Sequence, residues 1–571
     1  MRKLLLLIPQ SQKYKTILFF LFSILLMLLE SISIAIIIPF LSFIIDGDIN
    51  NIPYGNYLNL FFNFFDFENI LIFLSLLILI FFIFKNIFLI YLRWWSYNFV
   101  NHLVYILETR LFENYLKQNY FKVISTNSSE KLRNIRNETS SFAKYLNSII
   151  VIIIELMVFI GILFLIFFVY TWGSLISMII FGSLAFVFYV ASKKLLIKWS
   201  EKKIFHSGKS IKVLIEAFNA IKEIKIFRKE NYFIKNFSYH VKNSLKFNTW
   251  FNTYNETPKI FSEILVIIFI CSFTLYMTAE DVSKKDILTS LALFAVVTIR
   301  LLPSTTRIIS SMNTYKSALP SVDILINELK DENKIKEKNY SKNFLEIKDK
   351  IVFSNVSLVF PNQILPILEN VSFKINSGEM IGISGTSGSG KSTLINLLTG
   401  LIQPTSGKIF FDNTLMNNHS NFSIGYISQE TLLLDNTIKY NIVFGEDADK
   451  FNEKRFLEAI KIADLEELVL SLSDGFDTYI GEKGLKISGG QRQKIAIARA
   501  LYTNSNILIF DEATNQIDEK TEIKIFGNLR KISKDKTVFF VSHNLTLFNN
   551  CDKIINIKNN KVNFLQENEN I

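Results

Sequence analysis

Six long apolar segments in the first part of the chain most restrict the fold that it can adopt. Each fits the length of about 20 residues that an α-helix needs to cross a bilayer. The 571-residue chain is 50% hydrophobic, which is too apolar for an ordinary soluble protein of this length. We therefore expect an all-α membrane domain with six helices near residues 16–46, 69–98, 142–170, 173–196, 259–279 and 287–316.

The distribution of basic residues predicts the orientation of these helices. The loop at 47–68 contains no Lys or Arg, whereas the segments 103–145 and 193–258 contain many. Basic loops remain on the cytoplasmic side of a membrane. The two long basic segments and the N-terminus are therefore expected in the cytoplasm.

The composition changes after residue 316. The charged stretch NELKDENKIKEKNYSKN indicates a linker. Beyond it, short apolar runs such as EMIGIS, SIGYIS, NILIFD and TVFFVSH alternate with helical patterns, which is typical of an α/β domain. The predicted boundaries are 1–318 for the membrane domain, 319–345 for the linker and 346–571 for the α/β domain.

The net charge of +11 has two interpretations. A basic chain can bind nucleic acid, but lysines that flank membrane helices give the same total. We favour the second interpretation and expect no nucleic-acid partner. The chain has two cysteines, which excludes a disulfide scaffold.

A phosphate-binding loop is the first chemical motif of the α/β domain. GTSGSGKS at 385–392 follows the predicted strand 379–384 and precedes an apolar helical pattern. Glycines let the backbone N–H groups turn toward phosphate oxygens, while Lys391 reaches the β- and γ-phosphates and Ser392 binds Mg²⁺. The predicted nucleotide ligands are Gly385, Thr386, Ser387, Gly388, Ser389, Gly390, Lys391, Ser392 and Thr393.

Two acids end a second predicted strand, NILIFDE at 506–512. Asp511 is placed to hold Mg²⁺, and Glu512 to orient or deprotonate an attacking water molecule. Two acids that simply end a strand are the alternative, but the phosphate-binding loop makes it less attractive.

The stretch KISGGQRQKIAIARA at 486–500 resembles the LSGGQ signature of ATP-binding cassette (ABC) ATPases. Other family elements follow in order, with departures such as Phe instead of Tyr at 360. The resemblance implies an ABC transporter type 1 transmembrane fold followed by an α/β P-loop NTPase domain, with ATP and Mg²⁺ as cofactors. One cassette and six spans resemble a half-transporter, so the implied partner is a second copy of the chain. The resemblance assigns Phe360 to adenine stacking, Gln429 to Mg²⁺ sensing, Ser488, Gly489, Gly490 and Gln491 to the signature, Asp518 to the D-loop, and His543 to the γ-phosphate.

Four cations fall within or beside the predicted spans. Charges in a membrane are costly and by default indicate a functional interior site. Helical rise places these cations in the cytoplasmic half of the bilayer, where they could bind the anionic head of a lipid substrate. Snorkelling to lipid phosphates and neutralisation by Glu30, Glu155 and Glu263 are the alternatives. The candidate substrate residues are Lys85, Lys259, Arg300 and Arg307.

An external segment adds a second clue. Residues 56–67, NYLNLFFNFFDF, place four apolar side chains at helical spacing with polar side chains opposite. This pattern indicates an amphipathic helix in the outer interface that touches a lipid tail, or a Phe-rich loop that packs on helix ends.

LLESISIAIIIPFLSFI (28–44) and RLLPSTTRI (300–308) resemble segments of bacterial PglK-type flippases of lipid-linked oligosaccharides. That resemblance implies an ATP-driven homodimer in the bacterial inner membrane that moves a polyprenyl-diphosphate oligosaccharide to the outer leaflet. An exporter of a peptide, a lipid A-like lipid or a hydrophobic drug is the alternative. A soluble-type ABC ATPase that acts on DNA or ribosomes is excluded by the six spans.

Overall fold

The computed structural model describes residues 13–46, 70–169, 171–279, 284–330, 347–360, 363–416, 422–533, 536–542, 548–549 and 551–565. The chain divides into two units. One is formed by Met1–Gln118 with Ser125–Ile335, and the other by Asn119–Ile124 with Lys336–Ile571. Two predictions lie outside the described residues: the segment 56–67, expected to be an amphipathic helix or a Phe-rich loop, and His543, which the resemblance assigns to the γ-phosphate.

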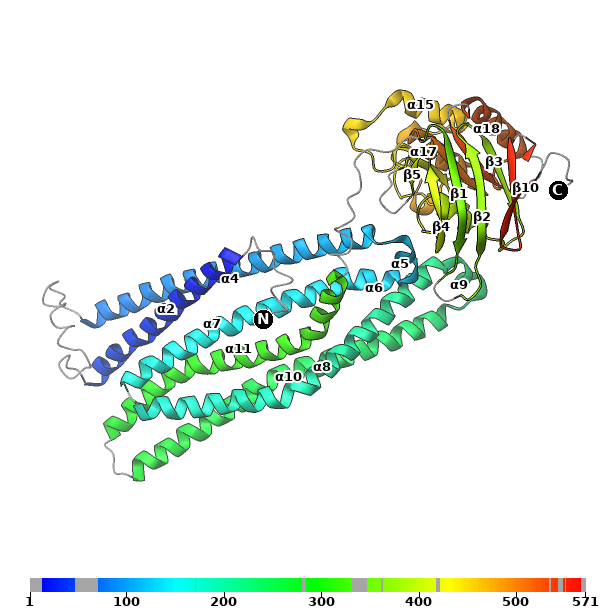
Figure 1. The fold of residues 1–571 in the computed structure, drawn as a ribbon. Coiled ribbons are helices and arrows are strands. Elements are labelled where there is room, and N and C mark those ends of the chain that lie inside the picture. Colours follow the sequence, from blue (N-terminus) through cyan, green and yellow to red (C-terminus); the bar gives the residue numbers. More distant parts are fainter. Residues whose placement is uncertain are drawn as a thin grey trace. The chain divides into compact units, whose positions relative to one another are not determined.

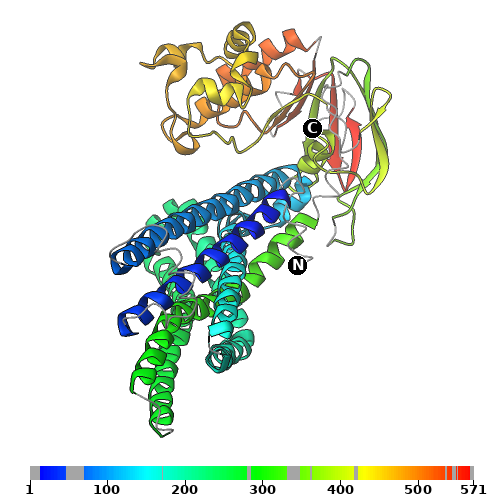
Figure 2. The same cartoon turned by 90° about the vertical axis from the view of Figure 1, so that its left-hand side faces the viewer.

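The first unit consists of long helices that run side by side (Figures 1 and 2). Helix α11 packs on α7, and α10 packs on α8, while α2 lies against α4 and α7. Short helices and one π-helical turn (Asn134–Glu138) lie in the connections. The helices of this unit are α2 (Lys13–Asp46), α4 (Ile70–Lys117), α6 (Ser128–Arg133), α7 (Thr139–Val169), α8 (Thr171–Asn219), α9 (Ile221–Phe227), α10 (Glu230–Ala279) and α11 (Lys284–Lys330). The short α5 (Tyr120–Ser125) belongs almost wholly to the second unit.

Apolar side chains lie both inside and outside this unit. Leu107, Phe142 and Leu325 come from α4, α7 and α11 and are buried in one shared core. On α4, the large side chains Ile80 and Ile87 are exposed. An apolar outer face is what a lipid-facing helix requires. Four helical segments in the described part of the chain are long and apolar enough to cross a membrane: Ile17–Ile37, Ile72–Lys117, Ser128–Leu165 and Glu230–Ala279.

The helices extend well beyond the predicted spans, and two differences follow. Helix α11 continues to Lys330, twelve residues into the range predicted as a linker. The second basic segment is helical almost throughout, because α8 reaches Asn219 and α10 begins at Glu230. The short helix α9 connects these two long helices.

The second unit contains two sheets with helices packed on them (Figure 1). The smaller sheet is antiparallel in the order β2-β1-β4-β5. The larger sheet has the order β10-β9-β3-β8-β7-β6, in which all neighbours are parallel except β10 and β9. The strands are β1 (Lys350–Leu358), β2 (Leu368–Asn376), β3 (Met380–Gly385), β4 (Ser406–Phe411), β5 (Thr414–Leu415), β6 (Ile424–Ile427), β7 (Ile507–Asp511), β8 (Thr537–Val541), β9 (Lys553–Lys558) and β10 (Lys561–Leu565).

The parallel strands are almost wholly buried, which explains their continuous apolar sequences. All five residues of β8 are buried, as are four of the five in β7. The four predicted β-rich runs correspond to β3, β6, β7 and β8 and confirm the α/β assignment. The helices are α13 (Lys391–Leu398), α14 (Ile438–Val443), α15 (Glu453–Ile462), α16 (Glu466–Leu470), α17 (Gly489–Tyr502) and α18 (Glu519–Ile532).

Candidate nucleotide site and a buried ion-pair network

The phosphate-binding loop connects β3 to α13, as the sequence predicts. Gly385, Gly388 and Gly390 have φ angles of 152°, 79° and 107°. Residues other than glycine rarely adopt these angles. A Cβ atom on Gly385 would also lie 2.8 Å from the carbonyl oxygen of Ile557. The loop therefore depends on glycine both for its backbone angles and for its packing.

Polar atoms of this loop suit a phosphate. Lys391 donates from Nζ to the carbonyl oxygens of Gly385 (2.7 Å) and Thr386 (3.3 Å). The hydroxyl oxygen of Ser389 is buried and has no hydrogen-bond partner among the described residues. A buried hydroxyl without a partner is costly, and a phosphate oxygen would accept its hydrogen bond. Ser392 is exposed at the start of α13.

The two acids that end β7 lie beside residues from β6 and its following loop. Gln429 donates from Nε2 to Oε2 of Glu512 at 2.7 Å, and Asn515 approaches the same oxygen at 3.5 Å. Tyr426 donates its hydroxyl to Oδ2 of Asp511 at 3.1 Å. Burial raises the pKa of Asp511, and the neighbouring Glu512 carboxylate raises it further. A divalent cation is the natural partner for two such carboxylates.

Sequence reasoning did not select Tyr426 or Asn515. Strand β6 is parallel to β7, and Tyr426 pairs with Ile509, two residues before Asp511. The sequence feature that could have indicated Tyr426 is its position in a predicted strand, three residues before Gln429. Asn515 lies three residues before Asp518, which is the only residue of the sequence NQID at 515–518 that the resemblance assigned.

The signature glycines begin helix α17. Ser488 caps this helix: its hydroxyl accepts from Gln491 N at 3.3 Å, and Gln491 Oε1 accepts from Ser488 N at 2.8 Å. A Cβ atom on Gly490 would lie 2.9 Å from the backbone carbonyl oxygen of Gln516, so this glycine allows the two backbone segments to pack closely. Within the described part of the chain, no hydrogen bond joins these residues to the phosphate-binding loop.

Asp518 caps helix α18 by accepting a hydrogen bond from Thr521 N at 2.9 Å. That hydrogen bond lowers the pKa of the aspartate. The cap is a structural function in itself, and the D-loop role assigned by resemblance stays a prediction. Phe360 is half-buried just after β1, and its role in stacking is also a prediction.

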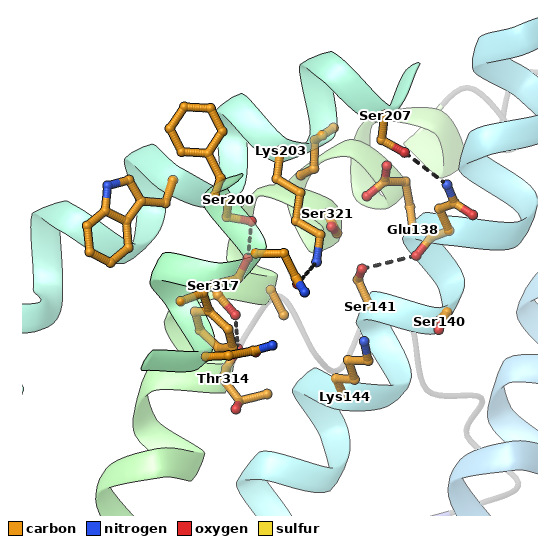
Figure 3. A pocket seen from close by; sticks show the side chains of 18 residues that line it. Glu138, Ser140, Ser141, Lys144, Ser200, Lys203, Ser207, Thr314, Ser317 and Ser321 are labelled. Carbon is orange, nitrogen blue, oxygen red and sulfur yellow. Dashed lines mark hydrogen bonds between the residues drawn. The ribbon is translucent and has the colours of Figure 1, made fainter. Parts of the chain in front are cut away.

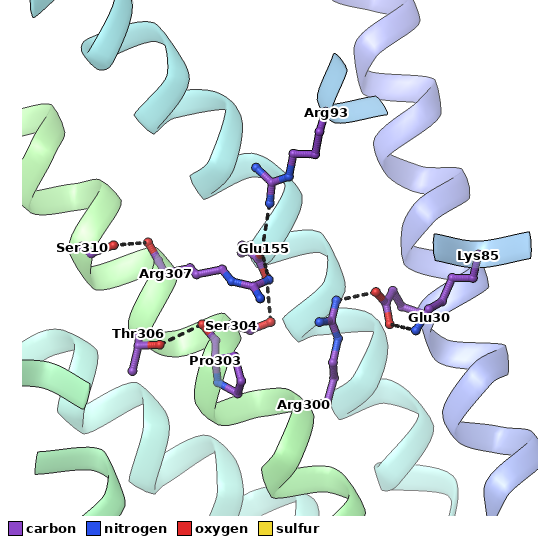
Figure 4. A network of polar contacts seen from close by, with 10 residues as sticks. All are labelled: Glu30, Lys85, Arg93, Glu155, Arg300, Pro303, Ser304, Thr306, Arg307 and Ser310. Carbon is purple, nitrogen blue, oxygen red and sulfur yellow. Dashed lines mark hydrogen bonds and ion pairs between the residues drawn. The ribbon is translucent and has the colours of Figure 1, made fainter. Parts of the chain in front are cut away.

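In the helical unit, two buried glutamates form ion pairs with Lys and Arg side chains from different helices (Figure 4). Glu30 on α2 pairs with Lys85 at 3.1 Å and with Arg300. The Glu30 carboxylate is 2% exposed. Since Lys85 belongs to α4 and Arg300 to α11, this acid joins three helices.

The second acid, Glu155 on α7, has three partners (Figure 4). Arg307 lies 2.8 Å away and Arg93 3.4 Å away, and Ser304 donates its hydroxyl at 2.7 Å. Sequence reasoning did not select Arg93. The Glu155 carboxylate is 2% exposed, whereas the Arg307 side chain is 46% exposed.

The two clusters together hold more positive than negative charge. Four cations share two carboxylates, which leaves an excess of two positive charges. The Nε of Arg300 is buried and has no acceptor among the described residues. Neutralisation by Glu30 and Glu155 is therefore partial. Lys259 and Glu263 are exposed on α10 and form no ion pair with another described residue.

The fold and these motifs define the architecture of an ABC transporter: a helical transmembrane unit followed by a nucleotide-binding unit. The family model for the ABC transporter transmembrane region matches residues 15–301, which is 287 of the 571 residues. The model for the ABC transporter matches residues 368–515. The chain belongs to the ABC transporter family.

Individual relatives carry several different names. An ATP-dependent lipid A-core flippase of Saccharophagus degradans is 30% identical over 66% of this chain and 63% of its own length. The ABC transporter ATP-binding protein YknU of Bacillus subtilis is 36% identical over 43% of this chain and 42% of its own length. ABC transporter B family member 17 of Arabidopsis thaliana is 38% identical over 38% of this chain and 18% of its own length. The chain thus matches less than half the length of several curated relatives.

A solved structure shows the same fold. The structure of a bacterial Atm1-family ABC exporter with ATP bound aligns with a TM-score of 0.75. The alignment covers 95% of this chain and 93% of that one at 20% sequence identity. It supports the type 1 exporter arrangement of six long helices followed by an ATPase domain.

Proposed function

We propose that two copies of this chain form an ATP-driven exporter in the inner membrane of a bacterium, with the ATPase domains in the cytoplasm. Each chain has one phosphate-binding loop and one signature motif, and no hydrogen bond between described residues joins them. Two chains would complete two sites by pairing the loop of one with the signature of the other. This arrangement explains why a half-transporter needs a partner.

Different residues of this chain have different roles in ATP hydrolysis. Backbone N–H groups of the loop and Lys391 bind the phosphates, while Ser392 and Asp511 would hold Mg²⁺, which neutralises phosphate charge. Glu512 accepts a proton from the attacking water molecule. Gln429, which already contacts Glu512, positions that carboxylate. His543 is the proposed contact to the γ-phosphate.

The proposed cargo is a polyprenyl-diphosphate oligosaccharide or polysaccharide precursor, moved from the inner to the outer leaflet. The observation that carries this proposal is the surplus of two positive charges in the buried network, together with the unpaired Nε of Arg300. A guanidinium pairs with phosphate oxygens through two parallel hydrogen bonds. A diphosphate head would supply the acceptors that Glu30 and Glu155 do not.

A lipid A-like lipid is the second candidate, because lipid A-core flippases are among the relatives. A peptide or hydrophobic drug has less support, since neither requires a cationic surplus inside the helical unit. These cargoes differ in head group, which makes them separable by experiment.

Transport by the purified full-length protein in liposomes tests the proposal. The fluorescent lipids would be a polyprenyl-diphosphate oligosaccharide, the same oligosaccharide on a neutral polyprenyl ether, and a lipid A-core analogue. We expect ATP-dependent movement of the diphosphate lipid, reduced about 100-fold or more by Arg300→Ala with Arg307→Ala because each of the two lost charge-assisted hydrogen bonds contributes about 1.5–3 kcal/mol. The exposed Lys235→Ala on α10 is the matched control. Equal transport of the neutral lipid, or full transport by the double variant, contradicts the assigned cargo.

A further inference from the structure

A cavity in the helical unit is separate from the ion-pair network. It has a volume of ≈ 330 Å³ and lies between the π-helical turn and helices α7, α8, α10 and α11 (Figure 3). This volume falls at the lower end of the range for small-molecule sites, about 300–1,000 Å³. None of the residues in the ion-pair network lines it.

The position of the cavity relates it to that network along one helix. Thr314 and Ser321 line the cavity, and they follow Arg307 by seven and fourteen residues on α11. At a rise of 1.5 Å per residue, this places them about 10 and 20 Å beyond Arg307. The direction is toward the C-terminal end of α11, which leads to the nucleotide-binding unit and is therefore cytoplasmic.

The lining combines hydroxyls, amides and aromatic side chains with the charged side chains of Glu138, Lys144 and Lys203. Hydroxyls come from α7, α8 and α11, for example Ser141, Ser200 and Ser317, and amides come from Asn248 and Asn252 on α10. Trp199, Phe247 and Phe251 also line the cavity. Hydroxyls and amides both donate and accept hydrogen bonds, while an aromatic ring offers a flat apolar surface. A pyranose ring presents the same combination of hydroxyl edge and apolar face.

One polar atom of the lining lacks a partner. The carboxylate of Glu138 is 2% exposed, and its Oε1 lies 3.2 Å from Nε of Arg133. Its Oε2 is buried and accepts no hydrogen bond from any described residue, although the hydroxyl of Ser321 interacts with the same carboxylate. A buried carboxylate oxygen without a donor costs about 1–3 kcal/mol or more, and a ligand hydroxyl would supply the donor.

The backbone at Glu138 is also unusual. Asn134–Glu138 forms a π-helical turn at the start of α7, and such turns occur frequently at functional sites. On the opposite wall, Lys203 donates from Nζ to Oδ1 of Asn248 at 2.8 Å. This hydrogen bond holds one of the two lining amides of α10 in place.

We infer that this cavity binds sugar residues of the cargo while its diphosphate is held by the ion-pair network. The inference rests on the proposed function, because it takes the cargo to be a diphosphate-linked saccharide. The lipid end of such a molecule lies in the membrane, its diphosphate contacts Arg300 and Arg307, and its saccharide extends toward the cytoplasm along α11. Glu138 and the serine hydroxyls then recognise the sugar.

Binding of free sugars to the full-length protein in lipid nanodiscs tests this assignment without lipid or diphosphate. The probes are N-acetylglucosamine, galactose and a chitin trisaccharide, and the readout is the fluorescence of Trp199, identified by its loss in Trp199→Phe. We expect saturable binding that weakens at least tenfold in Glu138→Gln and in Ser141→Leu, which extends a side chain into the cavity. Thr249→Leu, an exposed position beside Asn248 on α10, should bind as the wild type does.

The outcomes separate this inference from the proposed function. Two outcomes overturn the inference alone, if the protein transports the diphosphate lipid. One is that no sugar binds, and the other is that sugar binding is unaffected by both cavity variants. Sugar binding that depends on Glu138 but no transport of the diphosphate lipid overturns the proposed cargo and leaves a sugar site. Sugar binding should also survive Arg300→Ala with Arg307→Ala, since these residues contact the diphosphate. A cavity that binds a short acidic peptide in preference to every sugar contradicts the assignment.

Discussion

The side-chain amide of Gln429 donates to the Glu512 carboxylate at 2.7 Å, so a residue that follows β6 holds the acid that follows β7. Glu512 has a φ angle of 51°, which is unusual for a residue with a side chain. The acid is thus fixed from two directions, by its own backbone and by Gln429. Such fixation is expected of a group that must orient one water molecule.

Replacement of this acid should stop hydrolysis but preserve nucleotide binding. A positioned general base contributes about 10²–10⁴-fold to rate, so Glu512→Gln should lower phosphate release at least 100-fold. The amide keeps the shape of the side chain, and ATP binding measured by equilibrium filtration should remain within a few-fold of the wild type. Hydrolysis near the wild-type rate would show that another group is the base.

The aromatic ring at position 360 should determine nucleotide affinity. Stacking of a base on an aromatic side chain contributes about 1–3 kcal/mol, so Phe360→Ala should weaken ATP binding roughly tenfold, as measured by displacement of a fluorescent nucleotide. Phe360→Tyr retains the ring and should bind as the wild type does. Equal affinity for the alanine variant would remove this residue from the site.

The buried acid Glu155 should contribute strongly to the stability of the helical unit. Glu155→Gln leaves Arg93 and Arg307 without their shared counter-charge. Breaking a fully buried ion pair costs about 3–5 kcal/mol, and the loss here should be smaller because Arg93 and Arg307 are 25% and 46% exposed. Thermal unfolding of the full-length protein in detergent should show a clear loss. Glu263→Gln, at an exposed site without an ion pair to another described residue, is the control. A loss no larger than that of the control would mean that the network is not a structural element.

The nucleotide-binding unit should show one acid-dependent contact. Arg530 donates to both oxygens of Asp552 at 2.7 and 2.8 Å, and this contact lowers the pKa of the aspartate below its ordinary 3.8. A lowered pKa in the folded state means that the stabilisation is present above pH 3.8 and is lost as the pH falls through the folded-state pKa. Asp552→Asn should therefore cost about 1 kcal/mol at pH 7.

The same variant should lose its disadvantage in acid. Denaturant unfolding of the full-length wild type and variant, at pH 7 and near pH 3, measures the difference in free energy of unfolding. The exposed Asp449→Asn provides the baseline. A difference that is equal at both pH values would contradict the sign of the pKa change.

The sequence predicts those parts of the fold that a short stretch of neighbouring residues determines. The strands that carry Gly385 and Asp511 are short apolar runs that end in a motif, so both strand and motif were predicted within about one residue. The helix from 319 to 330 was missed, although Val322, Leu325 and Ile326 have helical spacing and are buried. The charges that follow in the sequence obscured that pattern.

The ion pairs of the helical unit were harder to predict from the sequence, because they depend on which helices pack together. Arg93 and Glu155 are 62 residues apart and meet only because α4 and α7 are neighbours. The same holds for Lys85 and Glu30, which come from α4 and α2. Neutralisation by acids was foreseen as an alternative, but a single sequence does not tell which cation each acid takes.

The most direct test of the account is movement of a fluorescent polyprenyl-diphosphate oligosaccharide across a liposome membrane that contains the purified protein. We predict that ATP with Mg²⁺ drives the lipid away from the leaflet on the ATPase side, and that Glu512→Gln in the same liposomes does not move it. Movement that is independent of ATP, or no movement although the protein hydrolyses ATP, would contradict the central claim that this chain couples hydrolysis to transport of that lipid.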